Sequence, residues 1–105
     1  MLVAFSVATS GGDQSVGDAV AAAVRVVRES GLPNETTSMF TTIEGEWDEV
    51  MDVVKRATEA VSAVSPRTSL VLKADIRPGH SDMLHGKVRR VEDALAAHRP
   101  AADRA

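Results

Sequence analysis

The sequence predicts an α+β fold, and two residue patterns support this prediction. Segments in which side chains alternate as in half-buried strands occur at residues 2–9, 34–44 and 67–77. Segments with apolar residues at helical spacing lie between them, from Ser15 to Gly31 and from Gly45 to Pro66. If residues 34–44 hold two strands, the order is βαββαβ with one further helix. This is the order of a ferredoxin-like antiparallel sheet with its helices on one face and, here, an extra C-terminal helix.

The first strand is predicted at residues 2–9, where large side chains alternate with small ones. Its large residues should face the core, and they are Val3, Phe5 and Val7. After a turn at Gly11-Gly12-Asp13, Ser15 is a suitable N-cap for a helix with an apolar stripe. Gly31, which Pro33 follows closely, predicts the end of this helix.

The stretch 39–50 joins a predicted strand directly to a predicted helix. Residues 34–44 are rich in threonine and suit two short strands that meet near residues 38–40. Three acids follow Gly45 in what should be a first helical turn, where the helix dipole favours negative charge; they are Glu46, Asp48 and Glu49. The apolar stripe that starts at Val50 continues until Pro66, which predicts the end of a long helix.

Residues 67–77 form the most regular alternation in the chain. One face should point to the core and holds Leu70, Leu72, Ala74 and Ile76. Ser81 can cap a last helix, whose narrow apolar seam is Leu84, Val88, Val91 and Leu95. We expect one domain over residues 1–99 and a flexible tail over residues 100–105.

Helices on one side of the sheet leave its other face bare. That face should carry Ala4, Ser6, Ala8, Val71, Lys73, Asp75 and Arg77. The mixture is too apolar at one end and too charged at the other for a face that only meets water. A face-to-face oligomer that encloses a polar pocket would explain both halves. Self-association would also help a chain of 105 residues, because small domains bury little surface.

Composition excludes several function classes. The net charge of -3 comes without a basic stripe, so we expect no nucleic-acid partner. The triplet Lys87, Arg89 and Arg90 is either a solvated helix face or a phosphate-binding patch. The absence of cysteine removes disulfides, thiolate metal sites and cysteine nucleophiles, and fits a cytosolic protein. The apolar run 2–8 is too short to cross a membrane and lacks the pattern of a signal peptide.

Two groups of polar residues are candidates for a site. Lys73, Asp75 and Arg77 lie on one side of their strand, each about 6.6 to 7 Å from the next, and suit either interface ion pairs or a polar ligand. Alternation places Glu44 on the face opposite Ile43, where it either begins the next helix or contacts a ligand.

Few residues are suited to cover a ring or to perform catalysis. Met39 suits the core or a ligand contact, while Phe40 and Trp47 suit stacking on a heterocycle or sealing a subunit boundary. The chain has no nucleophile elbow and no phosphate-cradling glycine loop. Its three histidines lack the spacing of a helical metal site.

Four fragments together resemble one known family: VAFSVA, VVRESGLPNETTSMFTTIEGEWDEV, LKADIR and GKVRRVEDAL. This is the thiamine-binding protein family, also called YkoF-like or UPF0045 and formerly a domain of unknown function, and the likeness spans roughly residues 2–97. The resemblance implies a ferredoxin-like fold, dimers that pair into tetramers, and no assigned enzymatic activity. It also implies that thiamine or its hydroxymethylpyrimidine moiety binds near subunit contacts.

The resemblance extends to individual residues. The residues that match the family's sequence motifs are Ser6, Thr37, Met39, Thr41, Glu44, Lys73, Asp75 and Arg77. This chain departs from the family at Thr9, where the first strand usually ends in proline, and at Ser38, where proline or alanine is frequent. Both changes alter loop shape near the expected pocket.

The leading hypothesis is therefore a non-catalytic cytosolic binder of thiamine or its pyrimidine. Glu44 or Asp75, with Ser6 or Thr37, would bond the aminopyrimidine, and Phe40 or Met39 would cover its ring. An alternative is a structural or regulatory module whose sheet face serves oligomerisation or a partner protein. A small enzyme that uses the sheet cleft is the third hypothesis, and it would need a buried histidine or carboxylate beside a pocket.

Overall fold

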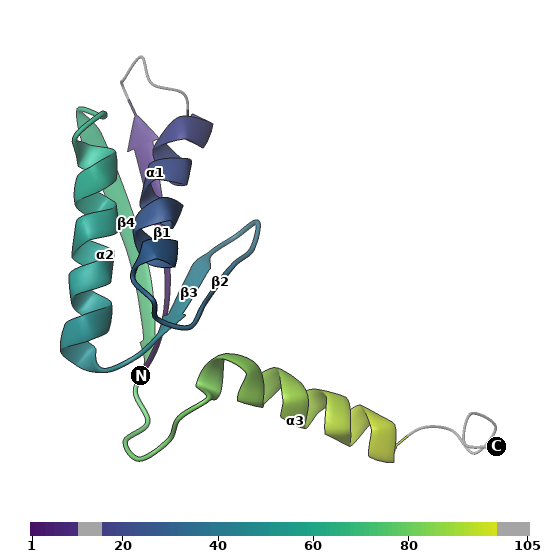
Figure 1. Cartoon of the computed structure of the whole chain (residues 1–105). Helices are drawn as coiled ribbons and strands as arrows, with labels where there is room; N and C mark the ends of the chain where they lie inside the picture. Colours follow the sequence, from purple (N-terminus) through teal and green to yellow (C-terminus); the bar gives the residue numbers. More distant parts are fainter. Residues whose placement is uncertain (11–15, 99–105) are drawn as a thin grey trace.

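The computed structural model describes residues 1–10 and 16–98 of the chain, which form four strands and three helices (Figure 1). The elements are β1 (Leu2–Ser10), α1 (Val16–Glu29), β2 (Asn34–Thr36), β3 (Thr41–Glu44), α2 (Trp47–Ser62), β4 (Arg67–Asp75) and α3 (Met83–Ala97). The sheet has the order β2-β3-β1-β4, and all its neighbouring strands are antiparallel. This confirms the predicted ferredoxin-like fold with an extra C-terminal helix. The expected turn at residues 11–13, the Ser15 cap and the tail at 100–105 lie outside the described residues.

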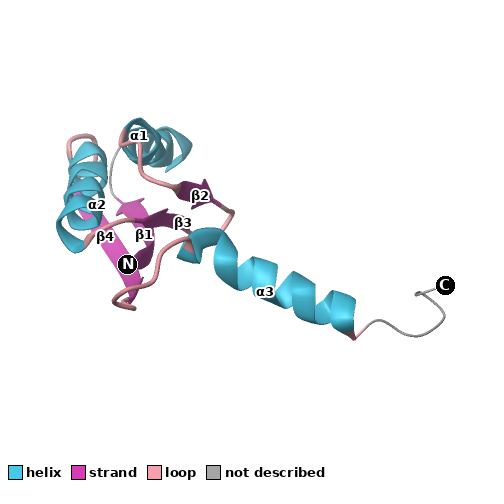
Figure 2. Ribbon diagram, turned by 60° about the horizontal axis from the view of Figure 1, so that its bottom comes forward, coloured by secondary structure: helices cyan, strands magenta, loops and turns pink. Residues whose placement is uncertain are grey.

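The core lies between the sheet and the pair of helices α1 and α2, which pack against each other on one face (Figure 2). On β1, Val3 and Phe5 are buried, and strand pairing places Val3 beside Ile43. The helices complete the core with Ala19, Ala23, Val27, Val50, Val53, Val54, Ala57 and Val61. The predicted alternation of the first strand is thus confirmed at its centre, because every second side chain enters an aliphatic core.

The predicted junction between β3 and α2 is confirmed, and a glycine makes it tight. A Cβ atom on Gly45 would lie 3.1 Å from the Val50 side chain, which is tighter than most Cβ contacts, so a larger residue would require Val50 to shift by a few tenths of an ångström. Glu46 is the N-cap of α2 and forms a capping box with Glu49, whose carboxylate accepts the Glu46 N–H at 3.3 Å. The helix ends at Ser62, earlier than Pro66, since a residue before proline avoids helical geometry.

Strand β4 is less buried than its alternation predicted. Leu72 packs against the core, but Leu70 is 42% exposed and Ile76 is 58% exposed. The expectation that both side chains lie in the core is wrong. For Leu70 the reason is that β4 is an outer strand, and none of the described strands pairs with its far edge. Ile76 follows the last residue of the strand.

The C-terminal half of β1, residues 6–10, pairs with a described strand on one side only. Strand β1 pairs with β4 from Leu2 to Ser10, whereas β3 reaches only as far as Phe5. Met1 and Gly45 form a hydrogen-bonded pair, in which the Met1 amino group donates to the Gly45 carbonyl at 2.9 Å and the Gly45 N–H donates to the Met1 carbonyl at 3.1 Å. In an antiparallel pair such residues alternate along the strand, so the odd-numbered residues of β1 direct their N–H and C=O groups toward β3. The next residue in this series, Val7, therefore directs its N–H and C=O toward an edge of β1 where no strand pairs within residues 1–10 and 16–98.

Helix α3 extends away from the sheet and its two covering helices (Figures 1 and 2). Met83 and Leu84 are buried, but the rest of the predicted seam is exposed: Val88 at 61%, Val91 at 57% and Leu95 at 62%. Its N-cap is Asp82 in a left-handed conformation, so the predicted cap at Ser81 is wrong. Among the described residues, no helix combines the length and apolar character that a membrane span requires.

Candidate functional site

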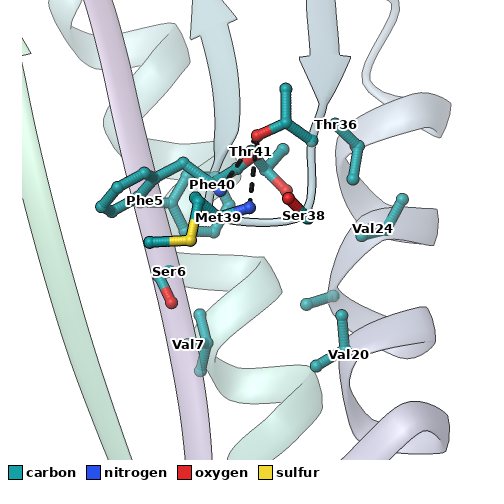
Figure 3. Close-up of a pocket in the computed structure, with 12 residues that line it drawn as sticks. Phe5, Ser6, Val7, Val20, Val24, Thr36, Ser38, Met39, Phe40 and Thr41 are labelled. Atoms are coloured by element: carbon teal, nitrogen blue, oxygen red, sulfur yellow. Dashed lines mark hydrogen bonds between the residues drawn. The ribbon is translucent and has the colours of Figure 1, made fainter.

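A small pocket lies where β3 ends and leaves the edge of β1 free (Figure 3). Its volume is about 150 Å³, and we call it the hairpin pocket. Three elements line it, namely β1 with Phe5, Ser6 and Val7, α1 with Val20, Ala23 and Val24, and the β2–β3 hairpin with residues 36–41. Figure 3 shows Val20 and Val24 across the gap from Ser6 and Val7.

Thr37 shapes the hairpin side of this pocket. Its hydroxyl accepts the N–H groups of Met39 and Phe40, both at 3.3 Å (dashed lines in Figure 3), and donates to the Phe40 carbonyl at 3.2 Å. These contacts close a short turn of the kind that threonine side chains favour. Thr37 therefore positions Met39 and Phe40, and its own hydrogen-bonding capacity is largely used within the turn.

The remaining lining combines apolar surface with hydroxyl groups. Phe5 is 2% exposed and forms a fixed wall, whereas Phe40 at 37% and Met39 at 73% are accessible to a ligand. Within the described part of the chain, the Ser6 and Ser38 hydroxyls make no hydrogen bond to protein groups. The pocket thus offers aromatic and sulfur surface for a ring, together with hydroxyls that can donate or accept.

Glu44 is buried and binds the first turn of α3. Its carboxylate accepts the backbone N–H of Met83 at 2.7 Å and that of Leu84 at 3.1 Å. These groups would otherwise lack partners, since a helix leaves its first N–H groups without intrahelical acceptors. The sequence leaves two alternatives for Glu44, the start of the next helix and a ligand contact. The helix that this carboxylate serves is a third element, 39 residues further along the chain.

The charged strand residues lie at a second hollow, on the face of the sheet away from α1 and α2, which we call the open face. This strand pocket has a volume of about 410 Å³ and is lined by Leu2, Ala4, Thr42, Lys73, Ala74, Asp75, Ile76 and Lys87. Asp75 forms a salt bridge with Lys87 of α3. The hydrogen bond from Lys87 lowers the pKa of Asp75 below its ordinary value of 3.8, and the charges of Lys87, Arg77 and Lys73 act in the same direction.

Replacing Asp75 by asparagine is expected to lower the melting temperature near pH 7 and to have little effect in acid. The ionised carboxylate stabilises the fold above the ordinary pKa of 3.8. That contribution is lost as the pH falls through the lower folded-state pKa. The difference in melting temperature between the wild type and Asp75→Asn should therefore shrink between about pH 7 and pH 2.

Asp52→Asn is the matched control, since Asp52 pairs with Arg56 on the same helix at 2.9 Å and links no two elements. At neutral pH, amide exchange in α3 should rise in Asp75→Asn and stay unchanged in Asp52→Asn. If the melting temperatures of the wild type and Asp75→Asn differed by the same amount at every pH, the ionised Asp75 carboxylate would not be the stabilising group.

The structure divides the predicted site residues into separate places. Five line the hairpin pocket: Ser6, Thr37, Met39, Phe40 and Thr41. Lys73 and Asp75 line the strand pocket, Glu44 binds α3, and Arg77 is exposed beyond the end of β4. Sequence reasoning missed Val20 and Val24, because a helical stripe does not show which of its residues border a pocket. It named Lys87 as part of a solvated helix face or a phosphate-binding patch, but did not connect it with Asp75. Among the described residues, no group of three or more potential ligands could hold a metal ion.

Comparison with known proteins places this fold in a family. The family model described as thiamine-binding protein matches residues 3–92. The chain belongs to the thiamine-binding protein family. A UPF0045 protein of Mycobacterium bovis is 57% identical over 96 residues, which make up 90% of this chain and 94% of that protein. The family's description carries no catalytic activity.

Solved structures of similar proteins agree with this membership. A domain of unknown function from Bacillus cereus has a TM-score of 0.80 and 34% identity, and the match covers 89% of this chain and 90% of that one. A protein of Thermotoga maritima, provisionally described as a thiamine biosynthesis or salvage protein, has a TM-score of 0.75 and 26% identity. That match covers 86% of this chain and 96% of the Thermotoga chain.

Proposed function

We propose that this protein is a non-catalytic cytosolic binder of thiamine or of its hydroxymethylpyrimidine moiety, and that the hairpin pocket receives the pyrimidine ring. Membership in the thiamine-binding protein family supports the ligand class. The description of the Thermotoga maritima protein, which refers to thiamine biosynthesis or salvage, supports it further. The observation that favours this pocket is that it gathers five of the predicted residues beside exposed aromatic and sulfur surface.

The size of the pocket favours one ring of thiamine over the whole molecule. Its volume of about 150 Å³ is close to that of an engineered protein cavity that binds benzene. A pyrimidine ring fits this space, and the thiazolium ring of thiamine would remain outside. Thiamine and hydroxymethylpyrimidine should therefore bind with similar affinity, while the isolated thiazole should not bind.

The polar edge of an aminopyrimidine suits the free edge of β1. An amino group and an adjacent ring nitrogen present a donor and an acceptor side by side, and a strand edge presents a C=O and an N–H in the same way. Val7 lines the pocket and directs its backbone groups toward this edge. In this proposal Val7 and the Ser6 hydroxyl hold the pyrimidine, because the carboxylates of Glu44 and Asp75 already have partners.

Substituting Val20 by phenylalanine is expected to weaken binding of hydroxymethylpyrimidine at least tenfold. Val20 lines the hairpin pocket and is 39% exposed, so a larger side chain can occupy the pocket without entering the core. Isothermal titration calorimetry with thiamine, hydroxymethylpyrimidine and the thiazole moiety measures the effect.

Val64→Phe is the matched control, because Val64 is 42% exposed and lies after α2, outside the pocket lining. Melting curves should show that both variants fold. The proposal is wrong if wild-type protein gives neither heat nor a thermal shift with either pyrimidine ligand. Equal binding by Val20→Phe and wild type would place the ligand elsewhere.

The exposed seam of α3 favours a second role, self-association into a homo-oligomer. Three valine and leucine side chains spaced along one face of the helix are more than half exposed: Val88, Val91 and Leu95. Such a contiguous apolar stripe on a projecting helix generally has a partner. We propose that the partner is a second copy of the chain, and that its approach brings a subunit contact near the ligand pocket.

A further inference from the structure

The strand pocket combines cations from two elements that are not adjacent in sequence. Strand pairing sets Lys73 opposite Ala4 and Asp75 opposite Leu2, so these side chains share the open face. Helix α3 brings Lys87 to the same place, where it pairs with Asp75. The first turn of α3 is held there by Glu44, which binds the N–H groups of Met83 and Leu84.

The balance of charge in this hollow is positive. Asp75 is paired with Lys87, whereas Lys73 and Arg77 have no acidic partner within residues 1–10 and 16–98. Lys73 and Lys87 line the hollow together with Asp75, whereas Arg77 is exposed beyond the end of β4 and acts on Asp75 only through its charge. The two lysines and one carboxylate of the lining leave a local charge of about +1, and Arg77 adds a further positive charge next to the hollow, on a chain whose net charge is -3.

Other acids on the open face do not neutralise this charge. Glu44 lies two strands away from Asp75, across Leu2, at a separation of about 10 Å, and its carboxylate is directed to two backbone N–H groups of α3. Glu35 lies in the same line of paired residues across the sheet as Lys73, with Thr42 of β3 and Ala4 of β1 between them. Glu35 is therefore three strand spacings from Lys73. That separation is about 14 Å, longer than the screening length at physiological salt.

The lining also contains apolar surface below the cations. Leu2, Ala4 and Ile76 line the pocket, whose volume of about 410 Å³ exceeds what a bare inorganic anion fills. A ligand that matches the hollow therefore has a doubly charged group and a small apolar body. A phosphate monoester meets both conditions, because it carries a charge of about -1.5 to -2 at neutral pH.

We propose that the strand pocket is a second ligand site, separate from the hairpin pocket, which binds a phosphate monoester of a small apolar or aromatic body. Lys73 contacts the phosphate oxygens, and Lys87 does so while it remains paired with Asp75. Arg77 attracts the anion from beyond the end of β4, and the body of the ligand lies over Leu2 and Ala4. The site exists only when α3 is in place, since Lys87 comes from that helix.

Phenyl phosphate is a suitable probe, with inorganic phosphate and phenol as its two halves. Calorimetry on the full chain should detect binding of phenyl phosphate, and both halves should bind at least tenfold more weakly. Lys73→Gln should weaken phenyl phosphate about fivefold or more, because it removes one charge-assisted contact. Chemical shifts in the wild type should change at the amides of Ala4, Thr42 and Ala74, which line the pocket.

Lys55→Gln is the matched control, since Lys55 is an exposed lysine of α2, the helix on the other face of the sheet. It should leave the affinity for phenyl phosphate unchanged. Absence of binding to the wild type would overturn the proposal, as would equal losses in Lys73→Gln and Lys55→Gln. Inorganic phosphate that binds as tightly as the ester would overturn the assigned ligand class. If Val20→Phe lost as much affinity for phenyl phosphate as Lys73→Gln, the probe would bind in the hairpin pocket. Failure of this site can therefore be distinguished from failure of the proposed function.

Discussion

Replacing Glu44 by alanine is expected to lower the free energy of unfolding by about 2 to 4 kcal/mol, the range for losing two hydrogen bonds to a buried charged acceptor. The carboxylate accepts the N–H groups of Met83 and Leu84 at 2.7 and 3.1 Å, and alanine leaves both donors without a partner. Met83 and Leu84 are themselves buried, so their N–H groups cannot simply turn to water. Urea denaturation measures the loss, and amide exchange should show α3 detaching before the sheet unfolds.

Two variants separate this role from a general effect of charge. Glu44→Gln keeps an acceptor of similar shape and should lose less stability than alanine, since its neutral amide makes weaker bonds. Glu35→Ala removes an exposed glutamate from β2 and should change the free energy of unfolding by less than about 0.5 kcal/mol. If Glu44→Ala were no more destabilising than Glu35→Ala, the contact between Glu44 and α3 would not be a structural anchor.

Substituting Val91 by glutamate is expected to shift the protein from an oligomer to a monomer. Val91 is 57% exposed on the seam of α3, so the change does not disturb the monomer core, but it places a charge in the proposed interface. Light scattering coupled to size-exclusion chromatography measures the mass of each species. The wild type should elute as a dimer or tetramer and the variant as a monomer at the same concentration.

The control for this change is Val64→Glu, an equally charged substitution at a valine that is 42% exposed and lies outside α3. It should leave the oligomer intact, and melting curves should show that both variants fold. A wild-type chain that is monomeric at all accessible concentrations, or a Val91→Glu chain that remains oligomeric, would exclude the seam as the interface.

The fold was predictable because its signals are local. Alternation along β1 predicted the burial of Val3 and Phe5, and the acids after Gly45 predicted the start of α2. The same kind of signal failed on β4, where Leu70 alternates like a core residue but lies 42% exposed on an outer strand. Alternation shows which face a side chain takes, and the position of the strand in the sheet determines how much of that face is covered.

The candidate site was predictable only in part. The threonine-rich hairpin was expected to contribute Thr37, Met39 and Phe40, and these residues do line one pocket. The walls from α1 were not expected, since Val20 and Val24 belong to an ordinary apolar stripe. The sequence places Lys87 in a solvated helix face or a phosphate-binding patch, but nothing near it in sequence indicates its pairing with Asp75.

Neighbouring residues and whole fragments are enough to predict the element order, the α+β class and the resemblance to the thiamine-binding protein family. The arrangement around the stretch 39–50 depends instead on contacts made in the folded chain. There β3 begins only at Thr41, opposite Phe5, so that no described strand pairs with the following part of this edge of β1, while Glu44 binds a helix that begins 39 residues later. Strand length, sheet order and contacts between distant segments set these outcomes, and none of them is encoded in local periodicity.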